Sequence, residues 1–263
     1  MSDLKFLLPG QTLKETGTSM IVYGDPGVGK TSLIKTLLGW EHPIRDKDGK
    51  LLGGGWVNEP YCTPEEIFVV DVESGLEILK DKDGKLACTV YPVTESLDKF
   101  KDMVTYLVAG QHPFKYVFVD NMSELEKYIL LQRTKIKELS VPRQKEWGDS
   151  AFFMRKAIRD LRNLTYNGVN VIFNFWSMAI PLEEGVTQVC PMVMKSTTME
   201  YVGLVGHTAY MGIAKASGNR FLQFESKGMY KAKTRCERIN TFEEANLATI
   251  FRKIKGEPDD SKD

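Results

Sequence analysis

The sequence predicts an α/β fold, a three-layer sandwich in which helices cover both faces of a mixed, mostly parallel central sheet. Three observations predict it. Short apolar runs alternate with segments of helical periodicity along the first two thirds of the chain. A glycine-rich segment joins the first apolar run to the first helical segment. Past Ser177 the pattern changes to shorter strand-like segments, which we expect to be antiparallel additions at one side of the sheet.

Each predicted element follows from its local pattern. Strands rich in β-branched and aromatic residues are expected at 19–24, 67–71, 86–93, 116–120 and 169–175. Helices, with apolar residues at three- and four-residue intervals, are expected at 30–38, 95–109, 123–138 and 149–166. The later short strands are expected at 186–190, 207–214 and 220–225, and a final helix at 242–255.

We expect one domain over residues 1–256, followed by an acidic, disordered tail at 257–263. Residues 41–64 differ from their surroundings because they carry the turn-forming sequences Asp48-Gly49 and Gly53-Gly54-Gly55. This pattern indicates a hairpin-like insertion or a mobile loop. A subunit contact and a lid over a nucleobase are both open as its role.

Composition narrows the class of protein. The 263 residues include 35 Lys plus Arg and 35 Asp plus Glu, so the net charge is zero and any nucleic-acid contact must come from a local patch. The four cysteines are far apart and without a metal-binding spacing, which predicts reduced thiols (Cys62, Cys88, Cys190 and Cys236). The start of the chain does not have the pattern of a signal peptide, and no apolar run reaches the roughly 18 residues of a membrane span. We expect a cytoplasmic protein without a membrane partner.

A phosphate-binding loop follows the first predicted strand. The pattern Gly-x-x-x-x-Gly-Lys-[Ser/Thr] and the residue after it are filled by Gly24, Asp25, Pro26, Gly27, Val28, Gly29, Lys30, Thr31 and Ser32. Glycines let backbone N–H groups approach an anion, and the helix that follows adds its positive end. In this motif the lysine reaches the β- and γ-phosphates and the hydroxyl ligates Mg²⁺. The loop therefore predicts a site for ATP and Mg²⁺ in which Lys30 is catalytic and Thr31 is a metal ligand.

Two acidic residues end later strands at the same predicted edge of the sheet. Asp120 closes the apolar run 116–120 and is the expected second metal ligand, which also makes it a catalytic candidate. Glu73 lies just beyond the run 67–71, where the carboxyl ends of parallel strands meet. We take Glu73 as the candidate general base for the attacking water, with Asp71 as its competitor.

These elements, in this order, resemble the RecA-like core of recombination ATPases. In RecA a strand ending Asp-x-Glu follows the P-loop helix and supplies the catalytic glutamate, which Asp71-Val72-Glu73 matches. The second strand ending in Asp, the long helix at 149–166 and the buried strand at 169–175 match the elements that follow. The resemblance implies a RecA-like P-loop NTPase fold and ATPase activity.

More closely, the chain resembles phage nucleotide-binding proteins of RecA-like type that act as single-strand annealing proteins (Sak-type). The matching pieces, spread over about residues 15 to 240, are 24–31, 118–121, 147–149, 168–173 and 231–235. The resemblance implies a recombination protein that binds single-stranded DNA, assembles into a ring or filament and anneals complementary strands, with ATP binding or slow hydrolysis as the switch. It implies the host cytoplasm as location and a single-strand DNA-binding protein as a further partner.

The chain departs from the family after the buried strand. The family usually carries a His there, and RecA a Gln, that senses the γ-phosphate, whereas this sequence has Asn174, Phe175 and Trp176. Asn174 can hydrogen-bond to phosphate or water, but Trp176 cannot accept a hydrogen bond. The departure puts in question the usual coupling between nucleotide state and DNA binding, and fast hydrolysis with it.

In RecA-like proteins two loops hold DNA, and the matching stretches here are about 132–147 and 177–198. The candidate phosphate contacts are Arg133, Lys135, Lys137, Arg143, Lys145 and Lys195. Trp147 is a candidate platform for base stacking. Solvated helix faces carry such cations too, and a methionine cluster such as Met192, Met194 and Met199 is more often packing or a protein interface, so these alternatives stay open.

Lys233 and Arg235 have a separate implied role. In RecA-like assemblies basic residues of one protomer reach the γ-phosphate held by its neighbour, and by resemblance we assign this pair as such trans-acting catalytic residues.

Two functions compete with recombination. A helicase loader or regulatory ATPase acting on a protein partner is the main alternative. A small-molecule kinase is the other, although the sequence lacks the Arg-rich lid usual for such kinases.

Overall fold

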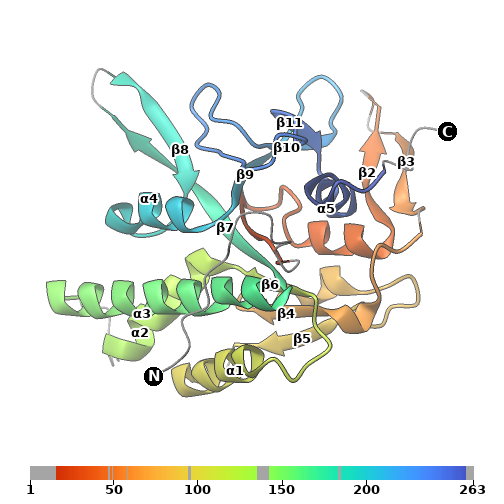
Figure 1. The fold of residues 1–263 in the computed structure, drawn as a ribbon. Helices are drawn as coiled ribbons and strands as arrows, with labels where there is room; N and C mark the ends of the chain where they lie inside the picture. The colour runs from red at the N-terminus through yellow and green to blue at the C-terminus, as the bar shows by residue number, and fades with distance from the viewer. Residues whose placement is uncertain are drawn as a thin grey trace, which may run out of the picture.

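The computed structural model describes residues 16–46, 48, 50–57, 59–93, 96–134, 142–182 and 185–258. Its centre is one nine-stranded sheet with the order β11-β10-β9-β1-β7-β6-β4-β5, and β8 lies off this path and pairs with β7 (Figure 1). The strands of this sheet are β1 Ser19–Gly24, β4 Ile67–Asp71, β5 Thr89–Pro92, β6 Tyr116–Asp120, β7 Asn170–Pro181, β8 Thr187–Pro191, β9 His207–Ile213, β10 Arg220–Gln223 and β11 Phe242–Glu244.

Strand β1 lies inside the sheet between two parallel neighbours. It pairs with β7 from Ser19–Val171 to Gly24–Trp176, and with β9 from Met20–His207 onward. Strands β7, β6, β4 and β5 continue the parallel part, whereas β10 and β11 add antiparallel pairs beyond β9. Burial on both faces explains why β1, β4 and β6 read as unbroken apolar runs.

Helices cover both faces of the sheet (Figure 1). The helical elements are η1 Ser32–Leu38, η2 Pro64–Glu66, η3 Leu76–Leu79, α1 Leu97–Ala109, α2 Met122–Thr134, α3 Gln144–Asn163, η4 Leu164–Asn167, α4 Lys195–Leu204 and α5 Leu247–Lys255. Alternation along β1 divides the interior into two cores, because Ile21 and Tyr23 face the helices α1 to α4, and Met20 and Val22 face η1 and α5. Each such fully buried apolar side chain contributes about 1.5–3 kcal/mol to stability. The predicted α/β sandwich with a mostly parallel mixed sheet is confirmed.

Several predicted bounds agree with the structure. The strands at 19–24, 67–71 and 116–120 are β1, β4 and β6 residue for residue. The strand predicted at 169–175 runs further, because residues 177–181 of β7 pair with β8 outside the parallel part of the sheet. Helix α3 begins five residues before the predicted residue 149, since Glu146 accepts a hydrogen bond from the backbone N–H of Arg143 and caps an earlier start.

Three predictions about the fold are wrong. The segment at 30–38 is a 3₁₀ helix that begins at Ser32. Residues 242–255 do not form one helix: Phe242–Glu244 is strand β11, and Asn246 then caps α5 by accepting a hydrogen bond from Thr249 N. Strand β9 is parallel to β1, because the helix α4, which the sequence analysis did not predict, provides the crossover that a parallel pair needs.

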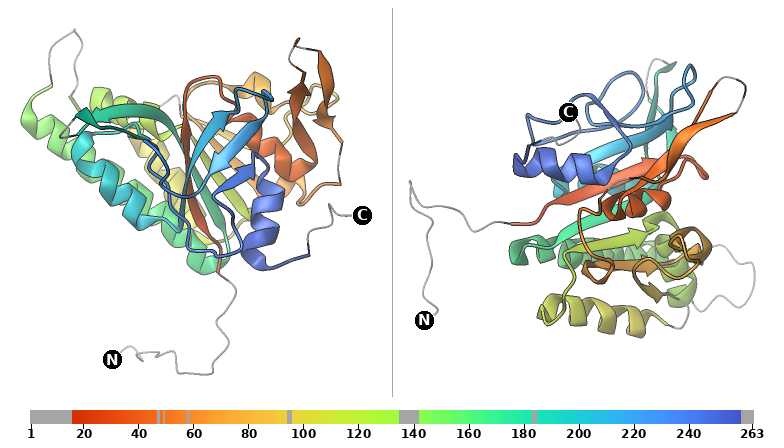
Figure 2. Two further views of the ribbon diagram at one scale, coloured as in Figure 1. Left: turned by 90° about the horizontal axis from the view of Figure 1, so that it is seen from above. Right: turned by 90° about the vertical axis from the view of Figure 1, so that its right-hand side faces the viewer.

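Residues 41–64 contain the antiparallel hairpin of β2 (Trp40–Arg45) and β3 (Leu51–Trp56), which stands apart from the main sheet (Figure 2). Its base packs against η1, where Lys35 Nζ lies 4.4 Å from the ring centre of Trp40 and 5.5 Å from that of Trp56. The hairpin is therefore held against the element that follows the glycine-rich loop. Within the described ranges, none of the helices is both long and apolar enough to cross a membrane.

Candidate nucleotide site

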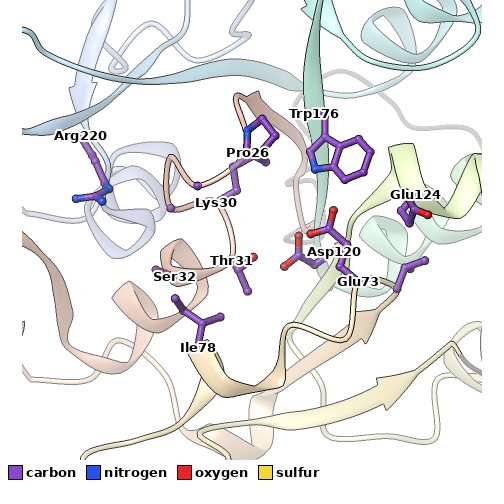
Figure 3. A pocket seen from close by; sticks show the side chains of 13 residues that line it. Pro26, Lys30, Thr31, Ser32, Glu73, Ile78, Asp120, Glu124, Trp176 and Arg220 are labelled. Atoms are coloured by element: carbon purple, nitrogen blue, oxygen red, sulfur yellow. The ribbon is translucent and has the colours of Figure 1, made fainter.

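At the carboxyl end of the parallel part of the sheet, β1, β7, β6 and β4 surround a cavity of about 630 Å³. This volume lies within the range of about 300–1,000 Å³ usual for small-molecule sites. The walls are formed by Pro26, Gly27, Gly29, Lys30, Thr31, Ser32, Val72, Glu73, Ile78, Asp120, Glu124, Trp176 and Arg220. Figure 3 shows the glycine-rich loop between two groups, with Arg220 on one side and the two acids with Trp176 on the other. Parallel strands thus bring the loop and both predicted acids to one place.

The glycines of the loop are required by its geometry. Gly29 has φ +106°, and a Cβ added there would lie 2.9 Å from both Arg220 Nε and His42 Cε1. At Gly24 a Cβ would lie 2.4 Å from the carbonyl oxygen of Met211 on β9. A side chain at either position would displace backbone or the residues that brace the loop, so the loop conformation depends on glycine.

Lys30 lies inside the loop with 7% of its surface exposed. Its Nζ donates to the carbonyl oxygens of Gly24 (2.8 Å) and Asp25 (2.9 Å). Burial lowers the pKa of Lys30, while the nearby acids Asp120, Glu73 and Asp25 oppose that effect. The ammonium group therefore lies at the cavity with acids close to it.

Asp120 is buried at the end of β6 and faces the loop. Asn174 Nδ2 donates to Asp120 Oδ1 at 3.1 Å, and the Thr31 side chain is hydrogen-bonded to the same carboxyl group. Burial raises the pKa of Asp120, and these two hydrogen bonds act against it. The buried Oδ1 of Asn174 and Oδ2 of Asp71 have no hydrogen-bond partner among the described residues. A hydroxyl, a carboxylate and unpartnered oxygens form a donor set that fits Mg²⁺, a cation that prefers oxygen ligands.

Glu73 and Asp71 occupy different environments. Glu73 lines the cavity and accepts a hydrogen bond from Asn121 Nδ2. Burial raises the pKa of Glu73, with Asp120 adding to the effect and Lys30 opposing it. Asp71 is 5% exposed and closes its own turn by accepting from Gly75 N at 3.2 Å. Of the two acids, Glu73 is the one that forms part of the cavity wall.

Three residues at the site have structural roles that the sequence analysis did not assign. Arg220 Nε donates to the carbonyl oxygen of Val28 at 2.7 Å and so braces the loop from β10. His42 packs beside it from the β2–β3 hairpin, and burial together with Arg220 lowers its pKa to about 3. Ser177 Oγ donates to Asp25 Oδ1. These contacts join positions 152 to 192 residues apart, and no local sequence pattern predicts them.

Trp176, the last residue of β7 that pairs with β1, is part of the cavity wall (Figure 3). Lys127 Nζ lies 4.1 Å from the centre of its ring. The neighbouring Asn174 points instead to Asp120 through the bond described above. The amide of Asn174 is thus the polar group that this stretch contributes next to the acids.

The predicted DNA contacts do not gather at the cavity. Arg143, Lys145 and Lys195 are exposed, the first two near the start of α3 and the third at the start of α4. Trp147 on α3 is 37% exposed. Lys135 and Lys137 lie outside the described residues, and so does the side chain of Arg133. The role of all of these residues remains a prediction.

Lys233 and Arg235 lie at the opposite edge of the sheet from the glycine-rich loop. Lys233 exchanges two backbone hydrogen bonds with Thr208 of β9, at 2.8 and 3.0 Å, and the adjacent His207 is in register with Met20. The loop leaves β1 at its other end, after Gly24. The pair therefore cannot serve the phosphate site of its own chain, and its assignment to a neighbour's site remains a prediction.

The strand order and the phosphate loop define a P-loop nucleotide-binding protein of RecA-like fold, in which β7 lies between the loop strand β1 and the Asp120 strand β6. A family model described as an AAA domain matches residues 16–236, so the chain belongs to that family. Among solved structures, the crystal structure of the RadB recombinase is similar, with a TM-score of 0.47 and 14% sequence identity over 81% of this chain and 85% of that chain. No curated protein matches the chain.

Proposed function

We propose that this protein is an ATP-binding recombination protein that hydrolyses ATP slowly, binds single-stranded DNA and promotes annealing of complementary strands. The observation that carries the nucleotide part is the joint placement of Lys30, Thr31, Asp120 and Glu73 around one cavity. ATP binding then requires backbone N–H groups of residues 24–32 to hold the phosphates, as in other P-loops. Thr31 and Asp120 are the residues that would hold Mg²⁺, which would neutralise phosphate charge.

In the proposed reaction Glu73 accepts a proton from water. The oxygen of that water forms a bond to the terminal phosphorus, and the bond from this phosphorus to the bridging oxygen of ADP breaks, so that ADP and phosphate leave. A carboxylate whose pKa is raised by burial accepts the proton more readily than an exposed one, which favours Glu73 for this role. Lys30 places its charge beside the phosphates, and Asn121 holds Glu73 by the hydrogen bond described above.

The DNA part of the proposal is supported by the exposed cations Arg143 and Lys145 and by the exposed ring of Trp147 beside them. Cations with an adjacent aromatic ring are the combination that binds single strands without sequence preference. We further propose that Lys233 and Arg235 act on the site of a neighbouring copy in a ring or filament, since they lie far from their own phosphate site.

The test measures ATP hydrolysis and single-stranded DNA binding in the same samples. Wild type is expected to hydrolyse ATP and to increase the fluorescence anisotropy of a labelled oligonucleotide, more strongly when ATP is present. Lys30→Ala is the negative control, because it lacks the lysine that contacts the phosphates and is expected not to hydrolyse ATP. Glu73→Gln is expected to bind ATP without turnover, and Glu77→Gln, an exposed acid outside the cavity, to behave as wild type. Absence of DNA binding at low salt, where phosphate contacts are strongest, would overturn the DNA part.

One observation favours the alternative of an ATPase that acts on a protein partner. Residues 177–194 contain no Lys or Arg, and Leu182 and Val186 of the β7–β8 hairpin are 46% and 55% exposed. A hairpin that has exposed apolar residues and whose only charged residues are Glu183 and Glu184 suits protein contact better than phosphate contact. If the protein hydrolyses ATP but fails to bind DNA, this alternative becomes the leading one.

A further inference from the structure

Helix α2 begins at the phosphate site. Asn121, immediately before it, donates from Nδ2 to Glu73, and its Oδ1 accepts from Glu124 N at 2.8 Å. The amide of Asn121 therefore both contacts a cavity residue and caps the helix. Any displacement of Glu73 acts directly on the first turn of α2.

Ser123, in that first turn, connects the helix to two further segments. It is 3% exposed, and its hydroxyl accepts from Trp176 N at 3.0 Å and donates to the carbonyl oxygen of Met192 at 2.6 Å. Trp176 belongs to the cavity wall, and Met192 follows β8. One hydroxyl thus joins α2, the cavity and the chain that leaves the β7–β8 hairpin.

Glu126 makes the next connection, three residues later and on the same face of the helix. It is 8% exposed, and its Oε2 accepts from Met194 N at 2.9 Å. Met194 is the N-cap residue immediately before α4, and its carbonyl oxygen accepts from Thr197 N. The other oxygen, Oε1, has no hydrogen-bond partner within the described part of the chain. A buried carboxyl group placed to hold a helix start is costly, so its position argues for a specific role.

We propose that Ser123 and Glu126 are positioning residues that transmit the occupancy of the phosphate site through α2 to residues 192–194 and the start of α4. The first residue of α4 is Lys195, one of the candidate DNA contacts, so this connection links the nucleotide to the placement of that cation. The inference rests on the proposed binding of ATP and is independent of the proposed binding of DNA.

The test is hydrogen exchange of the full-length chain with and without a non-hydrolysable ATP analogue and Mg²⁺. In wild type the analogue is expected to change exchange at the amides of residues 187–204. Ser123→Ala and Glu126→Leu are expected to lose that change and to keep their affinity for the analogue. Glu126→Gln, which retains an oxygen that can accept from Met194 N, is expected to restore it. Tyr128→Phe is the matched control, since it alters a side chain of the same helix whose hydroxyl has no partner among the described residues.

Each of the other outcomes contradicts the inference. The inference fails if wild type binds the analogue without any change at 187–204, while the proposed nucleotide binding stands. It fails as well if the change persists in Ser123→Ala and Glu126→Leu, or if Tyr128→Phe also loses it. If wild type does not bind the analogue, both the inference and the proposed function are wrong.

Discussion

The phosphate site and the surface proposed for DNA are built in opposite ways. At the phosphate site a nine-residue loop and the ends of three neighbouring strands converge, and Lys30, Asp120 and Asn174 are buried and hydrogen-bonded. At the proposed DNA surface the cations Arg143, Lys145 and Lys195 are exposed and start different helices. The difference teaches that a buried site depends on single contacts, whereas an exposed surface acts through the sum of its charges.

The largest expected effect is on the rate of ATP hydrolysis, and it is expected at Glu73 in the phosphate site. Replacing a general base typically slows the chemical step by about 10²–10⁴-fold, and Glu73→Gln is expected to lower the rate of ATP hydrolysis by that factor. Binding of ATP should change little, because the loop and Lys30 remain. Steady-state phosphate release together with an independent measurement of nucleotide affinity checks both statements. An unchanged rate would indicate that Asp71 is the general base and would contradict the site as described.

Glu126 is a buried acid outside the cavity, and its burial is expected to lower the free energy of unfolding in a pH-dependent way. Burial raises the pKa of Glu126 from 4.5 to about 7, so its contribution to stability is fully present below about pH 4.5 and is lost as the pH rises through about 7. At pH 8 this corresponds to a cost of about 3 kcal/mol. Glu126→Gln is therefore expected to raise the free energy of unfolding at pH 8 by up to that amount.

Urea denaturation at pH 8 and at pH 5 measures this effect. The gain from Glu126→Gln should shrink markedly at pH 5, where the wild-type carboxyl is protonated in the folded state. Glu124→Gln on the same helix is the control, because Glu124 is paired with Lys127 at the surface and is expected to change stability by less than about 1 kcal/mol. A destabilising Glu126→Gln at pH 8 would contradict the buried, unsatisfied state of this carboxyl group.

Gly29→Ala tests how strongly nucleotide binding at the buried site depends on the backbone conformation of the loop. Its φ of +106° disfavours any side chain, and the added Cβ also meets Arg220 and His42. Strain of about 1–3 kcal/mol would weaken nucleotide binding about fivefold to 150-fold. Gly27→Ala is the matched variant, since φ is +79° there but no atom lies within 4 Å of the added Cβ. Equal effects of the two variants would show that contact with Arg220 and His42 does not matter.

The smallest effects are expected at the exposed surface. Removal of one phosphate contact lowers the slope of log K against log salt by about 0.7 for single-stranded DNA, and Lys145→Ala and Arg143→Ala should each do so. Lys156→Ala, on the same helix α3 and paired with Asp160, should leave the slope unchanged. Anisotropy titrations at several salt concentrations measure these slopes. If all three variants have the wild-type slope, DNA does not contact the start of α3.

The parts of this molecule that were predictable are those fixed by local chemistry. Strands β1, β4 and β6 are buried on both faces, so their composition alone reveals them, and the loop at 24–31 is a backbone conformation that only a narrow set of residues allows. The bracing of that loop by Arg220 and His42 was not predictable, because it joins distant segments. Helix α4 escaped prediction since its sequence, with adjacent threonines, carries little amphipathic pattern.

The central position of β1 has a consequence for how the protein opens. Because β1 is hydrogen-bonded to β7 on one side and to β9 on the other, all of its amides can exchange with solvent only when both pairs separate, which approaches unfolding of the whole sheet. The β2–β3 hairpin, outside the main sheet, can open at a much lower free energy. The phosphate-binding loop is thus attached to a strand that opens only with the sheet, while His42, which packs against the loop, comes from a hairpin that opens more readily.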